Sequence, residues 1–274
     1  MSPALAQPSD VNPASATAAP GKPYVVDNGK VRSLHFDHEE IQSAMWVGRP
    51  HALYLEYTRL MMGFLMFAPK PSTIAMIGLG GGSLAKFCHR YLPDTRLVAV
   101  EVDPEVITLR DNFCVPADDM RWQVIQGDGA AFLARTPDAA FDVLMLDGYN
   151  AGGVPVALST QTFLDDCHRV LGENGVLVTN LHEAHADFAL QASRIRRSFG
   201  ATLEVREGVR GNCILFAGGP PLSAALRRVT MRRPQDLDRD AWTQLKPGFA
   251  RIFATIMQSD FGDPSYLFRT RVRP

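Results

Sequence analysis

Residues 74–87 of the 274-residue chain read IAMIGLGGGSLAKF. A short apolar run is followed by four glycines in five positions and then by a helical pattern. A strand, a tight glycine loop and a helix in this order bring the backbone close to a nucleotide. A purely structural turn is the alternative interpretation, and the sequence on both sides of the loop has to distinguish the two.

Strand-like and helix-like segments alternate from the glycine loop onward. The predicted strands are 73–78, 96–102, 121–128, 141–148 and 175–181, and the predicted helices are 82–92, 103–113, 129–135, 159–171 and 186–199. Two more strand-like runs, 201–207 and 212–219, have only a short turn between them. This order predicts an α/β fold with a mostly parallel sheet, helices on both faces and an antiparallel edge strand from the closing hairpin.

Acidic residues end two of the predicted strands where a nucleoside would lie. Glu101 ends the second strand, and its carboxylate can accept two hydrogen bonds from the hydroxyls of a ribose. Asp128, between Gly127 and Gly129 at the end of the third strand, can accept from the exocyclic amine of an adenine. A solvated acid at a strand end is the alternative for each. Together with the glycine loop, these residues predict an adenosyl site.

The glycine pattern limits the kind of adenosyl ligand. Gly78, Gly80 and Gly82 form G-x-G-x-G, and Ser83 stands where a dinucleotide motif has its third glycine. That motif seats a pyrophosphate on the N-terminus of the following helix. Because the third glycine is missing, we expect a ligand of the S-adenosylmethionine type, which has no phosphate, and not NAD.

The fourth predicted strand runs into LDGYNAGGVP, residues 146–155. Asp147 would project toward the sulfonium of such a ligand, and Gly152 and Gly153 would let the next loop act as a lid. Alkyl transfer from a sulfonium to an amine needs a neutral amine, although an alkylamine has a pKa of about 10. A carboxylate beside the amine can orient it and accept its proton. An aspartate that only stabilises the turn is the alternative.

With these motifs the chain resembles the spermidine synthase family of polyamine aminopropyltransferases. The similarity extends over residues 31–218 and includes VAVEVDPEV, VIQGDGAAFL, FDVLMLDGYN and LDDCHRVLGENGVLVTNL. It implies a Rossmann-like fold of the class I methyltransferase type behind a small N-terminal β region, and it implies a homodimer. It also implies that Glu101 binds the ribose, Asp128 binds the adenine and Asp147 assists deprotonation of the amine.

The same resemblance assigns further active-site residues by position. Gln42 and Tyr57 correspond to a glutamine and a tyrosine that reach the active site in the family. Tyr149 and Asn150, which follow Asp147, are expected near the substrate; packing under the loop is an equal alternative for Tyr149.

Two positions differ from the family pattern in charge. Gly81 stands where the family has an aspartate that faces the aminopropyl amine, and Asn150 stands where it has an acid that holds the far amine of the polyamine. A charge-assisted hydrogen bond is worth about 1.5–3 kcal/mol. The nucleoside half of the expected site is therefore kept, whereas its amine half is changed.

Composition and charge exclude several classes of protein. The chain is 46% hydrophobic and 21% charged, with a formal net charge of -1, so no basic face for nucleic acid is expected. No apolar run is long enough to cross a membrane. The four cysteines are scattered without a C-x-x-C pair, and His182 and His185 lack zinc-helix spacing, so no metal is expected. The first residues lack the features of a signal peptide, which makes a cytoplasmic location the expectation.

The chain divides into four predicted parts: a disordered leader at 1–22, a small N-terminal β-hairpin region at 23–55, the Rossmann-like adenosyl-binding catalytic domain at 56–220, and C-terminal helices with a tail at 221–274. A helix at 53–67, closed by Pro69 and Pro71, opens the catalytic part.

Three functions remain open at this point. The first is aminopropyl transfer from decarboxylated S-adenosylmethionine to a small-molecule amine. The second is N-methyl transfer from intact S-adenosylmethionine on the same fold, suggested by Gly81. The third is a nucleoside-binding protein without activity, against which the retained Asp147 argues.

Overall fold

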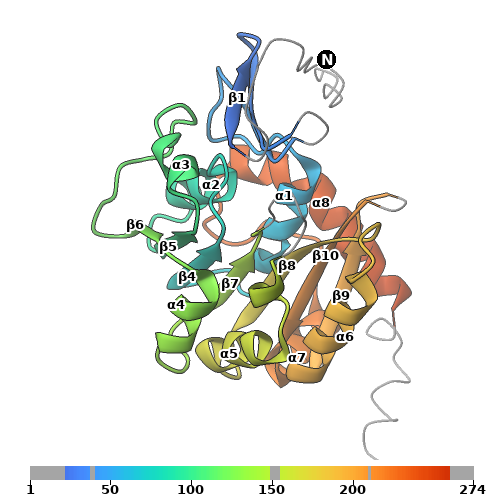
Figure 1. The fold of residues 1–274 in the computed structure, drawn as a ribbon. Coiled ribbons are helices and arrows are strands. Elements are labelled where there is room, and N and C mark those ends of the chain that lie inside the picture. The colour runs from blue at the N-terminus through green and yellow to red at the C-terminus, as the bar shows by residue number, and fades with distance from the viewer. Residues whose placement is uncertain (1–21, 38–40, 149–154, 209–210, 260–274) are drawn as a thin grey trace, which may run out of the picture.

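The structure is a computed structural model of the chain, and it describes residues 22–37, 41–148, 155–208 and 211–259 (Figure 1). In this described part, seven strands form the main sheet, in the order β6-β5-β4-β7-β8-β10-β9. Their bounds are β4 Thr73–Ile77, β5 Arg96–Glu101, β6 Trp122–Gln126, β7 Val143–Leu146, β8 Val176–His182, β9 Ala201–Arg206 and β10 Asn212–Gly218.

The order of the strands confirms the predicted Rossmann-like fold. Strands β6, β5, β4, β7 and β8 pair in parallel, and β10 pairs antiparallel with both β8 and β9. The antiparallel strand therefore lies one place in from the edge, and β9 takes the edge itself. All seven residues of β10 except Asn212 are buried, which explains why this apolar strand lies between two others and not at the rim.

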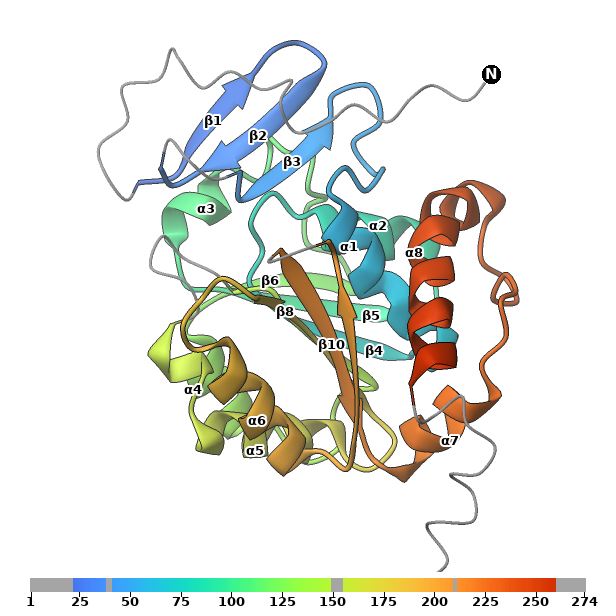
Figure 2. The same cartoon turned by 90° about the vertical axis from the view of Figure 1, so that its right-hand side faces the viewer.

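Helices cover both faces of the main sheet (Figure 2). On one face lie α4 Gly129–Arg135, α5 Gln161–Leu171 and α6 Phe188–Ser198; on the other lie α1 Glu56–Met61, α2 Ser83–Tyr91, α7 Pro220–Arg228 and α8 Arg239–Gln258. Side chains of β4 alternate between the two cores. Ala75 and Ile77 are buried with residues of α4, α5 and α6, whereas Ile74 and Met76 are buried with residues of α1, α2, α7 and α8. This alternation follows from the two-residue period of a strand.

A small antiparallel sheet stands above the carboxyl end of the main sheet (Figure 1). It is formed by β1 Tyr24–Asp27, β2 Val31–His35 and β3 Ser43–Trp46, in that order. The first two strands are joined at Asp27–Lys30, where the Asn28 side chain accepts from the amides of Lys30 and Val31. The predicted hairpin is present, and β3 extends it by one strand.

Two predicted helices are shorter than the sequence suggests. Helix α3 covers only Pro104–Thr108 of the expected 103–113. The carbonyl of Phe113 accepts from Lys86 (2.6 Å), and that of Asn112 accepts from Arg32. These side chains from other elements bind the carbonyl groups beyond α3, in a stretch that forms turns and not a longer helix.

The predicted helix at 53–67 begins later and changes type. The Arg59 guanidinium donates to the carbonyls of Leu53 and Tyr54, which holds this stretch extended before α1. After Met61 the chain continues as the 3₁₀-helix η2, Met62–Met66. Gly63 lies there against α8, and a Cβ on it would come within 2.1 Å of an Ile252 methyl group. The remaining 3₁₀-helix in the described chain is η3, Val156–Leu158.

The C-terminal helix belongs to the same core as the sheet. Leu245, Phe249 and Ile252 of α8 are fully buried in one cluster with Leu60 and Phe64. The four-part division of the chain by residue ranges stays a prediction. No helix among the described residues is long and apolar enough to cross a membrane.

Candidate active site

A cavity of about 1060 Å³ lies at the carboxyl ends of β4, β5, β6 and β7. The chain order of the strands reverses between β4 and β7, and ligands of open α/β sheets bind at such a switch point. The small N-terminal sheet contributes the opposite wall through Gln42, Ser43 and neighbouring residues.

The glycine loop between β4 and α2 forms the floor of this cavity. Gly78 has a φ of +97°, and a Cβ there would come within 2.4 Å of the Asp147 carbonyl oxygen. Gly80 and Gly82 also have positive φ, at +52° and +64°. A Cβ on Gly82 would come within 2.4 Å of a Val115 methyl group. Both conformation and space therefore require glycine at 78 and 82.

Glu101 fixes the loop from the neighbouring strand. It is 8% exposed at the end of β5; one carboxylate oxygen accepts from the amide of Leu79 (2.9 Å) and the other from the amide of Asp103 (3.0 Å). A carboxylate has about four lone-pair positions, so both oxygens keep capacity for the hydroxyls of a ribose. Glu101 lines the cavity, and its contact with a ribose stays a prediction.

Asp128 caps α4 and also lines the cavity, and its contact with an adenine stays a prediction. It is the N-cap of α4, and its Oδ1 accepts from the amide of Ala131 (2.7 Å). It also lines the cavity, with its side chain exposed. Gly129 is buried behind it, where a Cβ would come within 2.5 Å of an Ile77 methyl group. Glycine at 129 thus allows α4 to begin close to the end of β4, with Asp128 beside it at the cavity wall.

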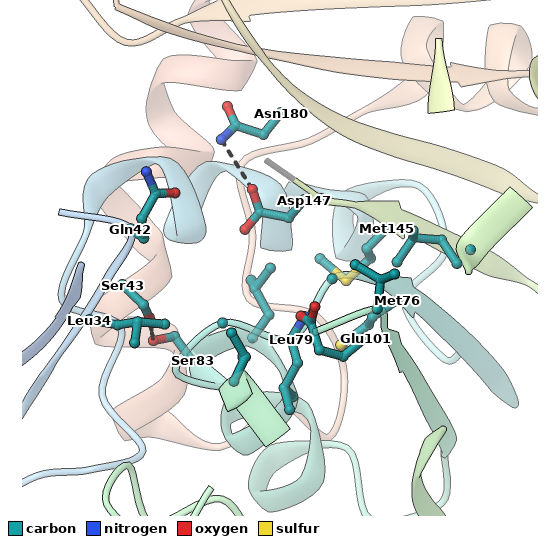
Figure 3. Close-up of a pocket in the computed structure, with 18 of the residues that line it drawn as sticks. Leu34, Gln42, Ser43, Met76, Leu79, Ser83, Glu101, Met145, Asp147 and Asn180 are labelled. Carbon is teal, nitrogen blue, oxygen red and sulfur yellow. Dashed lines mark hydrogen bonds between the residues drawn. The ribbon is translucent and has the colours of Figure 1, made fainter. Parts of the chain in front are cut away.

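Asp147 lies in the cavity directly after β7, and Figure 3 shows the hydrogen bond that it accepts from Asn180. The Tyr57 hydroxyl donates to Oδ2 (3.1 Å), and the Asn180 side-chain amide donates to Oδ1 (3.2 Å). Tyr57 comes from α1 and Asn180 from β8, so three separate elements meet at this carboxylate. The two donors fix its orientation.

The electrostatic surroundings of Asp147 oppose its charge. Burial raises the pKa of the carboxyl from 3.8 to about 6, and the hydrogen bonds from Asn180 and Tyr57 oppose this shift. At neutral pH the group is still mainly ionised. It binds a proton more readily than an exposed aspartate, which suits a group that accepts a proton during a reaction.

Residues 55–196 match the family profile described as the spermine/spermidine synthase domain, which is more than half of the chain. The chain belongs to the spermine/spermidine synthase family. A polyamine aminopropyltransferase from Chromobacterium violaceum is 36% identical over 216 residues, covering 78% of this chain and 82% of that protein.

Other relatives show how far the fold extends. The crystal structure of a probable spermidine synthase from Corynebacterium glutamicum has a TM-score of 0.63 at 21% identity and covers 75% of this chain and 82% of its own. An eEF1A lysine and N-terminal methyltransferase from Xenopus laevis is 31% identical over 159 residues, which are 52% of this chain and 23% of that protein. Family membership confirms the expectation of an enzyme of the aminopropyltransferase type.

For this member of the spermine/spermidine synthase family, the structure brings most of the predicted residues to one cavity. Gln42 precedes β3 and lines the cavity opposite Glu101 (Figure 3). Tyr149 and Asn150 lie outside the described residues, as do Gly152 and Gly153 of the predicted lid.

Sequence reasoning missed Asn180 and Ser43. Asn180 is a polar residue near the carboxyl end of β8, which is the same placement as Glu101 and Asp147, so its position was a usable signal. Ser43 opens β3 and is 6% exposed. Nothing in its sequence context distinguishes it from an ordinary strand residue. His182 and His185 also line the cavity, with ring centres 5.4 Å apart.

Metal ligands are not grouped in the described part of the chain: it holds no cluster of three or more His, Cys, Asp or Glu side chains placed for an ion.

Proposed function

We propose that this chain transfers an aminopropyl group from decarboxylated S-adenosylmethionine to an amine, in polyamine biosynthesis. The observation that carries the proposal is the Asp147 carboxylate, held by Tyr57 and Asn180 at the switch point of the sheet. The similarity to a polyamine aminopropyltransferase over most of both chains supports the same chemistry.

The nucleoside would lie along the edge of the sheet. Asp128, Glu101 and the glycine loop follow β6, β5 and β4, which are neighbours. Adenine at Asp128 and ribose at Glu101 would place the sulfonium above the loop, next to Asp147. Neighbouring strands lie about 4.8 Å apart. The distance from one strand end to the next is therefore comparable to the size of the adenine or of the ribose.

Asp147 would orient the attacking amine and accept its proton. The amine nitrogen forms a bond to the carbon of the aminopropyl group while the bond from that carbon to sulfur breaks, and the sulfur leaves as the neutral thioether methylthioadenosine. Positive charge moves from sulfur to nitrogen, so the proton on that nitrogen becomes acidic as the new bond forms. Tyr57 and Asn180 hold the carboxylate in position to accept it.

Release of methylthioadenosine tests this function. Purified chain is incubated with decarboxylated S-adenosylmethionine and a panel of diamines, longer polyamines and monoamines, and methylthioadenosine is measured by chromatography. We expect amine-dependent release with at least one acceptor. No release above the amine-free control with any acceptor would contradict the proposal.

Methyl transfer from intact S-adenosylmethionine is the second candidate. The Xenopus laevis methyltransferase relative favours it, although the match covers about half of this chain. The same assay with the intact form separates the two, because methyl transfer releases S-adenosylhomocysteine. The homodimer and the cytoplasmic location expected from sequence also belong to the proposal; light scattering of the purified chain tests the first.

A further inference from the structure

A side chain at the third glycine of the loop, Gly81, would force neighbouring side chains to move, although the backbone there would allow one. Gly81 is not among the residues with positive φ. A Cβ there would come within 2.7 Å of the Ser43 hydroxyl oxygen and 2.9 Å of the Phe113 ring. Ser43 therefore fills the space into which a side chain at 81 would point, and glycine at 81 follows from packing against β3.

Ser43 belongs to an uncharged part of the cavity wall. Its hydroxyl lies 3.4 Å from that of Ser83, the first residue of α2, and the Ser83 hydroxyl donates to the Ala44 carbonyl (3.5 Å). Gln42 adds a side-chain amide next to them. Figure 3 shows Gln42, Ser43 and Ser83 on one side of the cavity and Glu101 on the other, with Asp147 between.

This wall is where the tail of the co-substrate has to lie. In the proposed pose the ribose lies at Glu101, and the reacting carbon faces the amine at Asp147. The rest of the three-carbon chain on the sulfonium then extends toward the remaining side of the cavity. That side carries the hydroxyls of Ser43 and Ser83. A hydroxyl both donates and accepts, so it can bind an ammonium group or a carboxylate.

We propose that Ser43 is a specificity-determining residue. It occupies the space beside Gly81, so that an uncharged hydroxyl and not a carboxylate faces the co-substrate tail at this point of the wall. The chain then binds intact and decarboxylated S-adenosylmethionine with affinities that differ by less than tenfold. This inference rests on the proposed function, because it takes the position of the nucleoside from it.

Two other features of the wall bear on a carboxylate. The N-cap of α2 is Gly82, which has no side chain to bond the amides of the first turn, and the positive end of a helix dipole favours an anion. Asp37 also lines the cavity, on the segment before Gln42. Asp37 and Asp147 are both carboxylates of this cavity that would repel an acidic tail, and the affinity ratio that we expect already includes their repulsion.

Calorimetric titration of the unmodified chain with each form gives the first test. We expect a ratio of dissociation constants below ten, and a ratio of ten or more would overturn the inference. If neither form binds, the proposed function fails with it. If the chain releases methylthioadenosine but the ratio is ten or more, only the inference fails.

A matched pair of variants tests Ser43 directly. Ser43→Asp and Ser43→Asn differ in charge but hardly in size, and thermal melting checks that both fold. We expect the aspartate variant to favour the decarboxylated form at least tenfold more than the asparagine variant does, because its carboxylate would face that of the intact tail. Equal ratios in the two variants would show that Ser43 does not face the tail. If either variant fails to melt cooperatively, the ratio measured on the unmodified chain still decides.

Discussion

The Asp147 carboxyl lies in surroundings that raise its affinity for a proton, and this bears on its proposed role as the acceptor of a proton. An alkylamine has a pKa of about 10. This is about six units above the pKa of an ordinary aspartate, but only about four units above the pKa of Asp147, which is about 6. At 1.36 kcal/mol per unit, burial makes proton transfer to Asp147 easier by about 3 kcal/mol. The remaining difference is met during the reaction, as the amine acquires positive charge.

Replacing Asp147 by Asn removes the proton acceptor and keeps the shape. We expect kcat for aminopropyl transfer to fall by about 10²–10⁴-fold, the usual contribution of a positioned general base, while the affinity for methylthioadenosine changes less than threefold. Steady-state kinetics and calorimetry measure the two. Unchanged turnover would remove Asp147 from the mechanism.

The rate should depend on the protonation of the same group. Because burial raises the pKa of Asp147 to about 6, kcat should fall as the pH drops below about 6 and the carboxyl takes up a proton. Tyr57→Phe removes a hydrogen bond that lowers this pKa, so the acid limb of the profile should move to higher pH. An acid limb at the same pH in both proteins would contradict the role of Tyr57.

The raised pKa also links Asp147 to stability. The folded chain binds the Asp147 proton more tightly than the unfolded chain does. The free energy of unfolding therefore falls as the pH rises from about 4 to about 6, and it stays lower above that range. Asp147→Asn should therefore unfold at higher urea concentration than the natural chain at pH 8, with the difference vanishing near pH 4. A variant less stable at pH 8 would contradict the assigned shift.

How well single residues can be predicted depends on the kind of signal. Glu101, Asp128 and Asp147 each follow an apolar strand, and a carboxylate at the end of a strand is visible in the sequence. The resemblance implied only that Tyr57 reaches the active site; its hydrogen bond to Asp147, 90 residues away, appears in the structure alone. The role of Ser43 depends on contacts between distant segments, which no local pattern records.

At the scale of elements, the glycine loop couples the sheet to the site. Its turn passes so close to the end of β7 that the backbone of Asp147 touches Gly78. The loop therefore positions the proposed base as well as the proposed nucleoside site. The strands were predicted within a few residues because alternation and glycines are local signals. Helix α3 gives way to turns after Thr108, in a stretch where the carbonyls of Asn112 and Phe113 bind side chains from elsewhere in the fold.

Alanine substitutions at two glycines of the loop distinguish the effect of a close contact from the effect of an unfavourable backbone conformation. Gly78→Ala meets both a positive φ and the Asp147 carbonyl at 2.4 Å, whereas Gly80→Ala has a positive φ but a nearest contact of 3.7 Å. We expect Gly80→Ala to cost about 1 kcal/mol of unfolding free energy and Gly78→Ala about 1–3 kcal/mol more. Urea denaturation measures both, and equal losses would contradict the close approach.

At the scale of the whole molecule, the two ends of the described chain support the site from opposite directions. The N-terminal sheet provides the wall with Gln42 and Ser43. The C-terminal α8 packs against α1, which carries Tyr57, and a Cβ on Gly248 would already come within 3.3 Å of the Arg59 carbonyl oxygen. The sequence predicted α8 as a helix, but its contact with α1 joins residues almost 200 positions apart and has no local signature.

Truncating one side chain of α8 tests this support. Phe249 is fully buried, and Phe249→Ala should lower the unfolding free energy by about 3–5 kcal/mol. Met257, on the same helix, is 49% exposed, and Met257→Ala should change it by less than about 0.5 kcal/mol. Similar losses in the two variants would mean that α8 does not pack as described.

The most direct measurement follows the group that reaches the acceptor. The chain is given an accepted amine together with equal amounts of intact and decarboxylated S-adenosylmethionine, and the acceptor is analysed by mass spectrometry. We expect the acceptor to gain an aminopropyl group in the natural chain and much less in Asp147→Asn. An acceptor that gains a methyl group instead would contradict aminopropyl transfer as the function of this chain.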